Sequence, residues 1–236
     1  MAGWVRRRVY DGGERLWRVA DFQDASLLAV AQALSRLARE GELQRLSKGV
    51  YYRPRTTTFG PSSPNPADVR RLAETRRTVY PAGLPGANLL GFTTQAAART
   101  ELATSALSLP RKLVGDDTVV YTRRPAAWAA LSATEAALLD FLRRRATTSE
   151  LSPEETLRRT LALVTEPGRF ERLARVAPHE PPRVRAMLGA IGEQIGKKGT
   201  ILGRLRASLN PLSRFDFGLL AGLRSAKRWQ AKERKA

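Results

Sequence analysis

The 236-residue sequence contains no cysteine and a single histidine, His179. The lack of cysteine excludes disulfides and thiolate metal ligands, and it leads us to expect a protein of the reducing cytoplasm. A single histidine excludes multi-histidine metal sites and most serine–histidine or cysteine–histidine catalysis. No apolar run approaches the roughly 20 residues that a membrane-spanning helix needs. We therefore expect no metal, no cofactor and no membrane partner.

Acidic residues are also scarce, since 22 Asp and Glu face 41 Lys and Arg and the net charge is +19. Such an excess indicates a polyanionic partner, with nucleic acid ahead of an anionic membrane. The charge is uneven: residues 126–196 hold ten basic and nine acidic residues, whereas residues 197–236 hold eleven and two. Residues 1–60 hold eleven basic and six acidic residues. Basic segments thus flank a nearly neutral middle.

Proline marks the predicted domain boundary. The stretch Pro54–Pro66 has four prolines in thirteen residues, which cannot continue a helix and favour a semi-rigid connector with few contacts. We therefore expect a small domain at residues 1–58, a larger one at residues 66–223 and a frayed basic tail at residues 224–236.

The larger domain shows both strand and helix patterns, which predict a mixed α/β domain with a helical C-terminal half and an α+β class for the chain. Two capping boxes, Ser132 with Glu135 and Ser152 with Glu155, predict helix starts. Gly115-Asp116-Asp117 predicts a hairpin turn. The other predicted elements are strands at 100–104, 112–114 and 118–122 and helices at 169–176, 183–195 and 201–209.

The segment after residue 26 combines a helix with a hairpin. At 100° per residue, a core stripe forms from Leu27, Val30, Ala31, Leu34, Leu37 and Ala38. The opposite face carries Gln32, Arg36 and Arg39, with Ser35 on its flank. Gly41 is placed to end this helix, and residues 43–47 and 49–53 then pair around a Ser-Lys-Gly tip.

Upstream, residues 4–10 predict a helix, 16–18 a strand and 19–23 a short second helix, with Asp24 capping the third. This order of elements is typical of a winged helix-turn-helix with a recognition helix and a wing. We expect Gln32 and Arg36 to contact bases and Ser35 to lie beside them. We expect phosphate contacts from Arg39, Arg45, Lys48 and Arg53. The simpler alternative is a protein-docking domain whose arginines are merely solvated.

The stretch VADFQDAS…AVAQALSRLAREGELQRLSKGVYYRP resembles the N-terminal domain of AbiEi-type antitoxins of bacterial type IV toxin–antitoxin systems. Beyond the connector, PAGLPGANLLGFTTQAAARTELAT is similar to the start of the antitoxin domain, and EPPRVRAMLGAIGEQIG and LNPLSRFDFG also fit. Leu84-Pro85 departs from the small residues expected in the glycine-rich turn.

This resemblance implies a winged helix that represses its own operon and a second domain that counters a nucleotidyltransferase-like toxin without a stable complex. For useful specificity, two copies should bind an inverted repeat in double-stranded operator DNA. Two alternatives stay open: a winged-helix transcription regulator whose second domain senses a ligand or protein, and an RNA- or ribosome-associated module.

We find no catalytic constellation and expect no enzyme. The stretch Gly196–Thr200 lacks the spacing of a phosphate-binding loop, and Asp116-Asp117 fits a hairpin tip better than a metal pair. Arg183 and Arg185 are two residues apart on a predicted helix, so they point to different sides. One solvated arginine and one structural ion pair is the favoured interpretation there, ahead of contacts to toxin or RNA.

Overall fold

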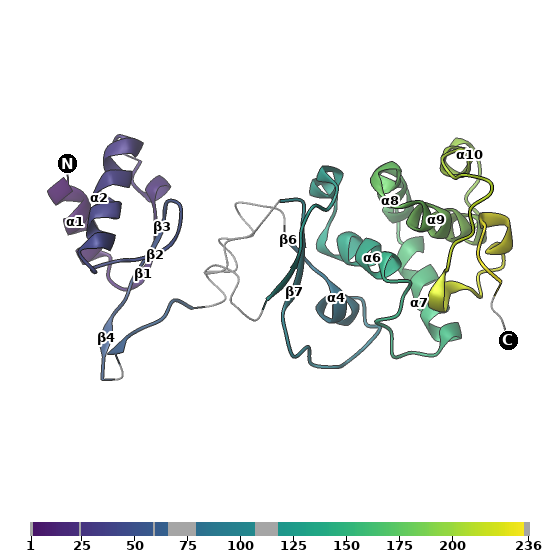
Figure 1. Ribbon diagram of the computed structural model, residues 1–236, viewed down its shortest axis with the longest axis horizontal. Helices are drawn as coiled ribbons and strands as arrows, with labels where there is room; N and C mark the ends of the chain where they lie inside the picture. The colour runs from purple at the N-terminus through teal and green to yellow at the C-terminus, as the bar shows by residue number, and fades with distance from the viewer. Residues whose placement is uncertain (1, 24, 59, 66–78, 107–117, 234–236) are drawn as a thin grey trace. The chain divides into compact units, whose positions relative to one another are not determined.

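The computed structural model describes residues 2–23, 25–58, 60–65, 79–106 and 118–233. The described residues divide into two compact units, one of residues 2–65 with Thr118 and one of residues 79–106 and 119–233. Each unit contains helices and a small sheet (Figure 1), so the chain is of the α+β class, as predicted.

The first unit packs two helices and a three-stranded antiparallel sheet around one core, in which Trp17, Phe22, Leu34 and Tyr51 are fully buried. The central strand of the sheet is β3, which pairs with β1 on one side and β2 on the other. The elements are α1 (Ala2–Asp11), β1 (Arg15–Arg18), the 3-10 turn η1 (Val19–Asp21), α2 (Leu27–Arg39), β2 (Gln44–Ser47) and β3 (Val50–Arg53).

These elements follow the predicted order, with local differences. The short second helix is reduced to the single turn η1. Ser26 takes the N-cap position of α2, and Asp24, the predicted cap, lies outside the described residues. Gly41 follows the end of α2 with φ of +80°, a left-handed conformation that glycine adopts without steric cost.

The connector after Pro54 makes more contacts than its prolines predicted. Residues Thr56–Thr57 (β4) and Gly60–Pro61 (β5) pair as a short antiparallel ribbon. The Ser62 hydroxyl lies 2.9 Å from that of Tyr52 and accepts a hydrogen bond from the Arg55 amide at 2.8 Å. The polar side chains of the connector therefore hold it against β3, and the expectation of few contacts is wrong for residues 55–58 and 60–62.

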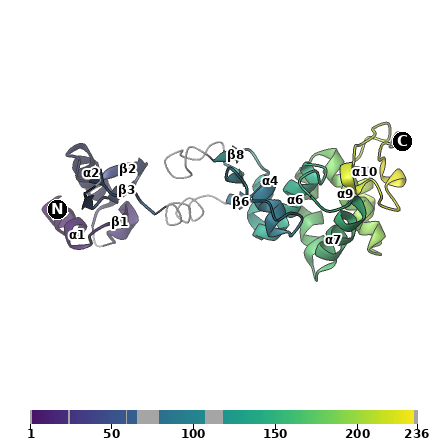
Figure 2. The same ribbon diagram turned by 90° about the horizontal axis from the view of Figure 1, so that it is seen from below.

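The second unit begins with a three-stranded sheet of order β6-β7-β8, in which β7 pairs antiparallel with β6 and parallel with β8. In Figures 1 and 2 this sheet lies at one end of the unit beside α4 and α6, and α10 lies at the other end with the C-terminal segment. The first elements are β6 (Val79–Pro81), α4 (Gly83–Leu89), β7 (Glu101–Thr104), β8 (Val119–Tyr121), the 3-10 turn η2 (Ala126–Ala130) and α6 (Ala133–Arg143).

The helical half follows the predicted pattern closely. Both capping boxes form, since Ser132 and Glu135 bond each other's backbone amides, as do Ser152 and Glu155. The predicted hairpin at residues 112–117 lies outside the described residues, and the described partner of β8 is β7. The remaining elements are α7 (Pro153–Thr165), α8 (Arg169–Val176), η3 (Ala177–His179), α9 (Pro182–Gln194), α10 (Thr200–Ala207), η4 (Gly218–Leu220) and η5 (Lys227–Trp229).

The C-terminal segment is folded as far as residue 233, so the expectation of a frayed tail is wrong there. Trp229 is 1% exposed, and its indole lies so close to Gly189 that a Cβ there would sit 2.1 Å from the ring. Its Nε1 donates a hydrogen bond of 2.7 Å to Glu193. The Phe215 amide donates to the Gln230 carbonyl at 2.7 Å, which holds the last strand-like residues beside the LNPLSRFDFG stretch. Burial of this tryptophan therefore holds the basic C-terminal segment against α9.

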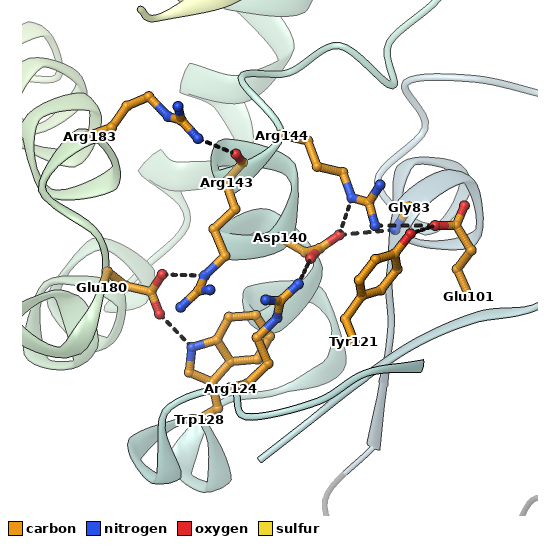
Figure 3. Close-up of polar contacts among 10 residues, drawn as sticks. All are labelled: Gly83, Glu101, Tyr121, Arg124, Trp128, Asp140, Arg143, Arg144, Glu180 and Arg183. Carbon is orange, nitrogen blue, oxygen red and sulfur yellow. Dashed lines mark hydrogen bonds and ion pairs between the residues drawn. The ribbon is translucent and has the colours of Figure 1, made fainter. Parts of the chain in front are cut away.

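A buried network of arginines and carboxylates joins the sheet to the helices (Figure 3). Asp140 on α6 is 1% exposed and accepts hydrogen bonds from Arg124 at 2.8 Å, Arg144 at 2.7 Å and the Gly83 amide at 3.0 Å. Burial and the nearby Arg143 guanidinium lower the pKa of Arg124. The two guanidinium groups and the N-terminus of α4 therefore share Asp140 as an acceptor.

Two further carboxylates extend this network (Figure 3). Glu101 on β7 accepts from Tyr121 at 2.7 Å and from Arg144 at 3.2 Å. Glu180 accepts from the Trp128 indole at 2.7 Å and from Arg143 at 2.6 Å. Each carboxylate joins elements that are distant in sequence, so the network orders the glycine-rich start of α4 against α6 and the sheet.

Replacing Asp140 tests this role. Asp140→Ala leaves the half-buried Arg124 without its carboxylate partner and Arg144 with Glu101 alone, and we expect a loss of about 3 kcal/mol in the free energy of unfolding. Asp140→Asn keeps an acceptor for the Gly83 amide and should lose less. Urea unfolding of the full chain, followed by tryptophan fluorescence, measures both. Glu233→Ala, which removes an exposed partner of Lys227, should leave stability unchanged. Equal effects of Asp140→Ala and Glu233→Ala would contradict a structural role for the network.

Candidate nucleic-acid interface

The outer face of α2 carries a stripe of exposed side chains. Its buried side consists of Val30, Ala33, Leu34 and Leu37, at the spacing of an amphipathic helix. Gln32, Arg36 and Arg39 are exposed on the other side, as predicted, and none has a hydrogen bond or ion pair with a described residue. Unpaired guanidinium groups on a helix surface remain available for an external anion.

Two leucines at the start of α2 differ from the prediction. Leu27, assigned to the core stripe, is 63% exposed, because the apolar side of α2 is covered only from Val30 onward. Leu28 is 70% exposed and precedes Gln32 and Arg36 at four-residue intervals, so it begins the exposed stripe. The helical spacing already placed Leu28 on this face, but its apolar character hid it from a search for polar contacts.

Ser35 lies at the edge of this face and is half-buried. Its hydroxyl is 2.9 Å from the hydroxyl of Tyr51, a core residue of β3 that is 2% exposed. This contact holds α2 against the sheet. The structure therefore gives Ser35 a positioning role next to the exposed stripe.

The hairpin of β2 and β3 presents Arg45 and Lys48. Arg45 is exposed on β2 and has no hydrogen bond or ion pair with a described residue. Lys48 is exposed in the two-residue turn between the strands, where Gly49 has φ of +70°. The glycine allows the tight turn, which leaves the lysine at the tip of the hairpin.

Arg53, the third predicted cation of the hairpin, serves α1. Its Nη1 donates to the Val9 carbonyl at 3.0 Å and also to the Tyr10 carbonyl, and its guanidinium lies 4.5 Å from the centre of the Tyr10 ring. A cation at the C-terminus of a helix satisfies free carbonyls and the helix dipole. The sequence pattern could not separate Arg53 from Arg45, because α1 is more than 40 residues away in the chain.

The C-terminus of α2 is held by a different arginine. Arg6 of α1 pairs with Glu40 at 2.6 Å and with Glu42 at 2.5 Å. The hydrogen bond from Arg6 lowers the pKa of Glu42, because it favours the ionised carboxylate. Two of the acidic groups near α2 are thus neutralised within the unit, which limits their repulsion of a polyanion at the exposed stripe.

The described residues offer no alternative metal centre. No group of three or more histidine or carboxylate side chains there could hold a metal ion. Asp116 and Asp117 lie outside the described residues. His179 is exposed in η3, and Arg183 donates to the Arg143 carbonyl at 2.8 Å, a structural contact. Within the described residues, no helix is both long and apolar enough to cross a membrane.

Comparison with known proteins gives little guidance. No family model matches the chain, and no curated protein matches it. Among solved structures, the chain is similar to the crystal structure of the RV2827C protein from Mycobacterium tuberculosis. The identity is 18%, the match covers 90% of this chain and 81% of that chain, and the TM-score is 0.42. So distant a likeness carries no functional argument.

The assignment of Arg53 to α1 has a measurable consequence. Arg53→Ala should reduce the stability of α1 by about 1–3 kcal/mol, because the carbonyls of its last turn lose a charged donor. Hydrogen–deuterium exchange of the α1 amides in the full chain measures this loss. Arg45→Ala is the matched control on the neighbouring strand and should leave exchange unchanged. Unchanged protection of α1 in Arg53→Ala would return Arg53 to the candidate DNA contacts.

Proposed function

We propose that the first unit binds duplex DNA as a winged helix-turn-helix, with α2 as the recognition helix and the β2–β3 hairpin as the wing. The observation that carries the proposal is the exposed stripe of Leu28, Gln32, Arg36 and Arg39. Its two arginines have no hydrogen bond or ion pair with a described residue, in a chain of net charge +19. The order of elements around α2 supports the same function.

In this proposal, some side chains of the first unit contact bases and others contact phosphates. Gln32 and Arg36 read base edges in the major groove, and Leu28 adds an apolar contact of the kind that thymine methyl groups accept. Arg39, Arg45 and Lys48 contact phosphates, which sets the register without reading sequence. Ser35 and Arg53 act indirectly by holding α2 and α1 in place.

We further propose that the chain is the antitoxin of a type IV toxin–antitoxin system, which represses its own operon and counters a nucleotidyltransferase-like toxin. This part rests on the resemblance to AbiEi-type antitoxins. The stretch PAGLPGANLLGFTTQ, which contributes to that resemblance, begins at the last residue of β6 and forms α4 and the following turn in the second unit. Two copies on an inverted repeat would supply specificity that one short site lacks.

A second candidate is a transcription regulator whose second unit senses a small ligand. A cavity between α8 and α10 favours it as a specific alternative. Footprinting the full chain on the DNA upstream of its own gene tests the DNA-binding proposal that both candidates share. Stronger binding to folded RNA than to that duplex would favour an RNA-associated module instead.

Two arginines on α2 should differ in their effects on binding. Arg36→Ala should cost about 1–3 kcal/mol on operator DNA and relax discrimination between sequences, because a base contact is lost. Arg39→Ala should weaken operator and non-specific DNA alike and reduce the slope of log K against log salt by about 1. Gel shifts over a salt series measure both. If Arg36→Ala binds the operator with unchanged affinity, α2 is not the recognition helix.

The two proposed activities should separate with the two units. A fragment of residues 66–236 should fold, lose operator binding and still protect cells that express the cognate toxin. Residues 1–65 should bind operator DNA weakly and give no protection, and so small a unit is of marginal stability. Growth after toxin co-expression and gel shifts of each fragment provide the measurements. Protection by residues 1–65 together with its loss from a folded 66–236 fragment would reverse the assignment.

A further inference from the structure

The second unit contains a cavity of about 450 Å³ between α8 and α10. This volume lies in the range of small-molecule sites in proteins. The cavity lies beside α10, and the segment that joins α9 to α10 contains Gly196 and Gly199, both with positive φ. No step of the proposed DNA binding uses these residues.

The apolar wall of the cavity is aliphatic. It consists of Ala174 from α8, Pro178 from η3, and Ile201 and Leu205 from α10. Among the described residues no aromatic ring lines the cavity, so a nucleobase would find no stacking partner in this part of the chain. An alkyl chain is the ligand body that such a wall solvates best.

Two guanidinium groups line the same cavity. Arg175 on α8 and Arg204 on α10 are exposed, and neither has a hydrogen bond or ion pair with a described residue. The carboxylate that also lines the cavity, Glu171, pairs with Lys197 at 2.6 Å, and this hydrogen bond lowers the pKa of Glu171. The hydroxyl of Ser208 donates to the Leu205 carbonyl at 2.7 Å. Among the described residues, the two arginines are therefore the charged groups of the cavity that have no protein partner.

We propose that this cavity binds an aliphatic anion, with the alkyl chain against Ile201 and Leu205 and the head group between Arg175 and Arg204. A carboxylate or a phosphate monoester fits the planar donor fork of arginine. Binding would place a counter-charge between two cations that have none and would remove the apolar wall from water. The inference concerns the second unit alone and is independent of DNA binding.

Isothermal titration calorimetry of the full chain tests the proposal with decanoate and decyl phosphate below their critical micelle concentrations. Both should bind at one saturable site, and the tighter of the two identifies the head group. Decanol, which lacks the charge, and acetate, which lacks the chain, should each bind at least about tenfold more weakly. Decanol binding as tightly as decanoate would overturn the proposal, since the arginines would then contribute nothing.

Substitutions separate this site from general attraction to a basic protein. Arg175→Gln and Arg204→Gln should each weaken decanoate binding by about tenfold. Arg158→Gln, on the exposed face of α7 and away from the cavity, is the matched control and should bind as the original chain does. Equal affinities of all three variants, several weak sites, or binding only at micelle-forming concentrations would each overturn the proposal.

Circular dichroism shows whether the glutamine variants fold. If they do not, a different variant tests the site. Ile201→Glu places a carboxylate at a position that is 36% exposed on the cavity wall, so the fold can tolerate it. Repulsion of the anionic head group should abolish decanoate binding. Retained one-site binding in folded Ile201→Glu would place the ligand elsewhere and contradict the assignment.

Discussion

Asp140 is a buried carboxylate that three separate parts of the second unit share, since the Gly83 amide, Arg124 and Arg144 all bond to it. Its loss would leave the start of α4 and two guanidinium groups without their shared acceptor, so the packing of α4, α6 and the sheet depends on it. With 22 acidic residues for 41 basic ones, the composition favours carboxylates that serve several donors.

Because carboxylates are few, only some arginines of the first unit have partners within the fold, and others remain available to an external ligand. Arg6 pairs with Glu40 and Glu42, and Arg53 uses backbone carbonyls at the end of α1. Arg36 and Arg39 have neither kind of partner among the described residues. An arginine that the fold does not use is free to bind phosphate or a base, and the exposed stripe on α2 collects such residues. The proposed interface is thus the surface on which the arginines have no carboxylate partner among the described residues.

The two proposed ligand surfaces differ in the chemistry that surrounds their arginines. On α2 the neighbours are Gln32 and an exposed leucine on a convex helix, which suits the groove of an extended polyanion. Between α8 and α10 the neighbours are buried and exposed aliphatic side chains around a cavity, which suits a small ligand with an alkyl chain. A protein with both surfaces could bind DNA through one unit and respond to a metabolite through the other.

The sequence by itself determined those structural features that depend on residues close together in the chain. The capping boxes at Ser132 and Ser152, the glycine after α2 and the phase of α2 depend on residues within one or two helical turns, so their patterns were sufficient. Only the tertiary structure decided which charged groups are paired. Arg45 and Arg53 are equivalent in the sequence pattern of the hairpin, yet only Arg53 donates hydrogen bonds to the carbonyls at the end of α1. Likewise, the basic C-terminal segment packs because Gly189 leaves room for the Trp229 ring and Glu193 accepts its hydrogen bond. Both residues lie about 40 positions earlier in the chain. Such partners are distant in the chain, and local periodicity carries no information about them.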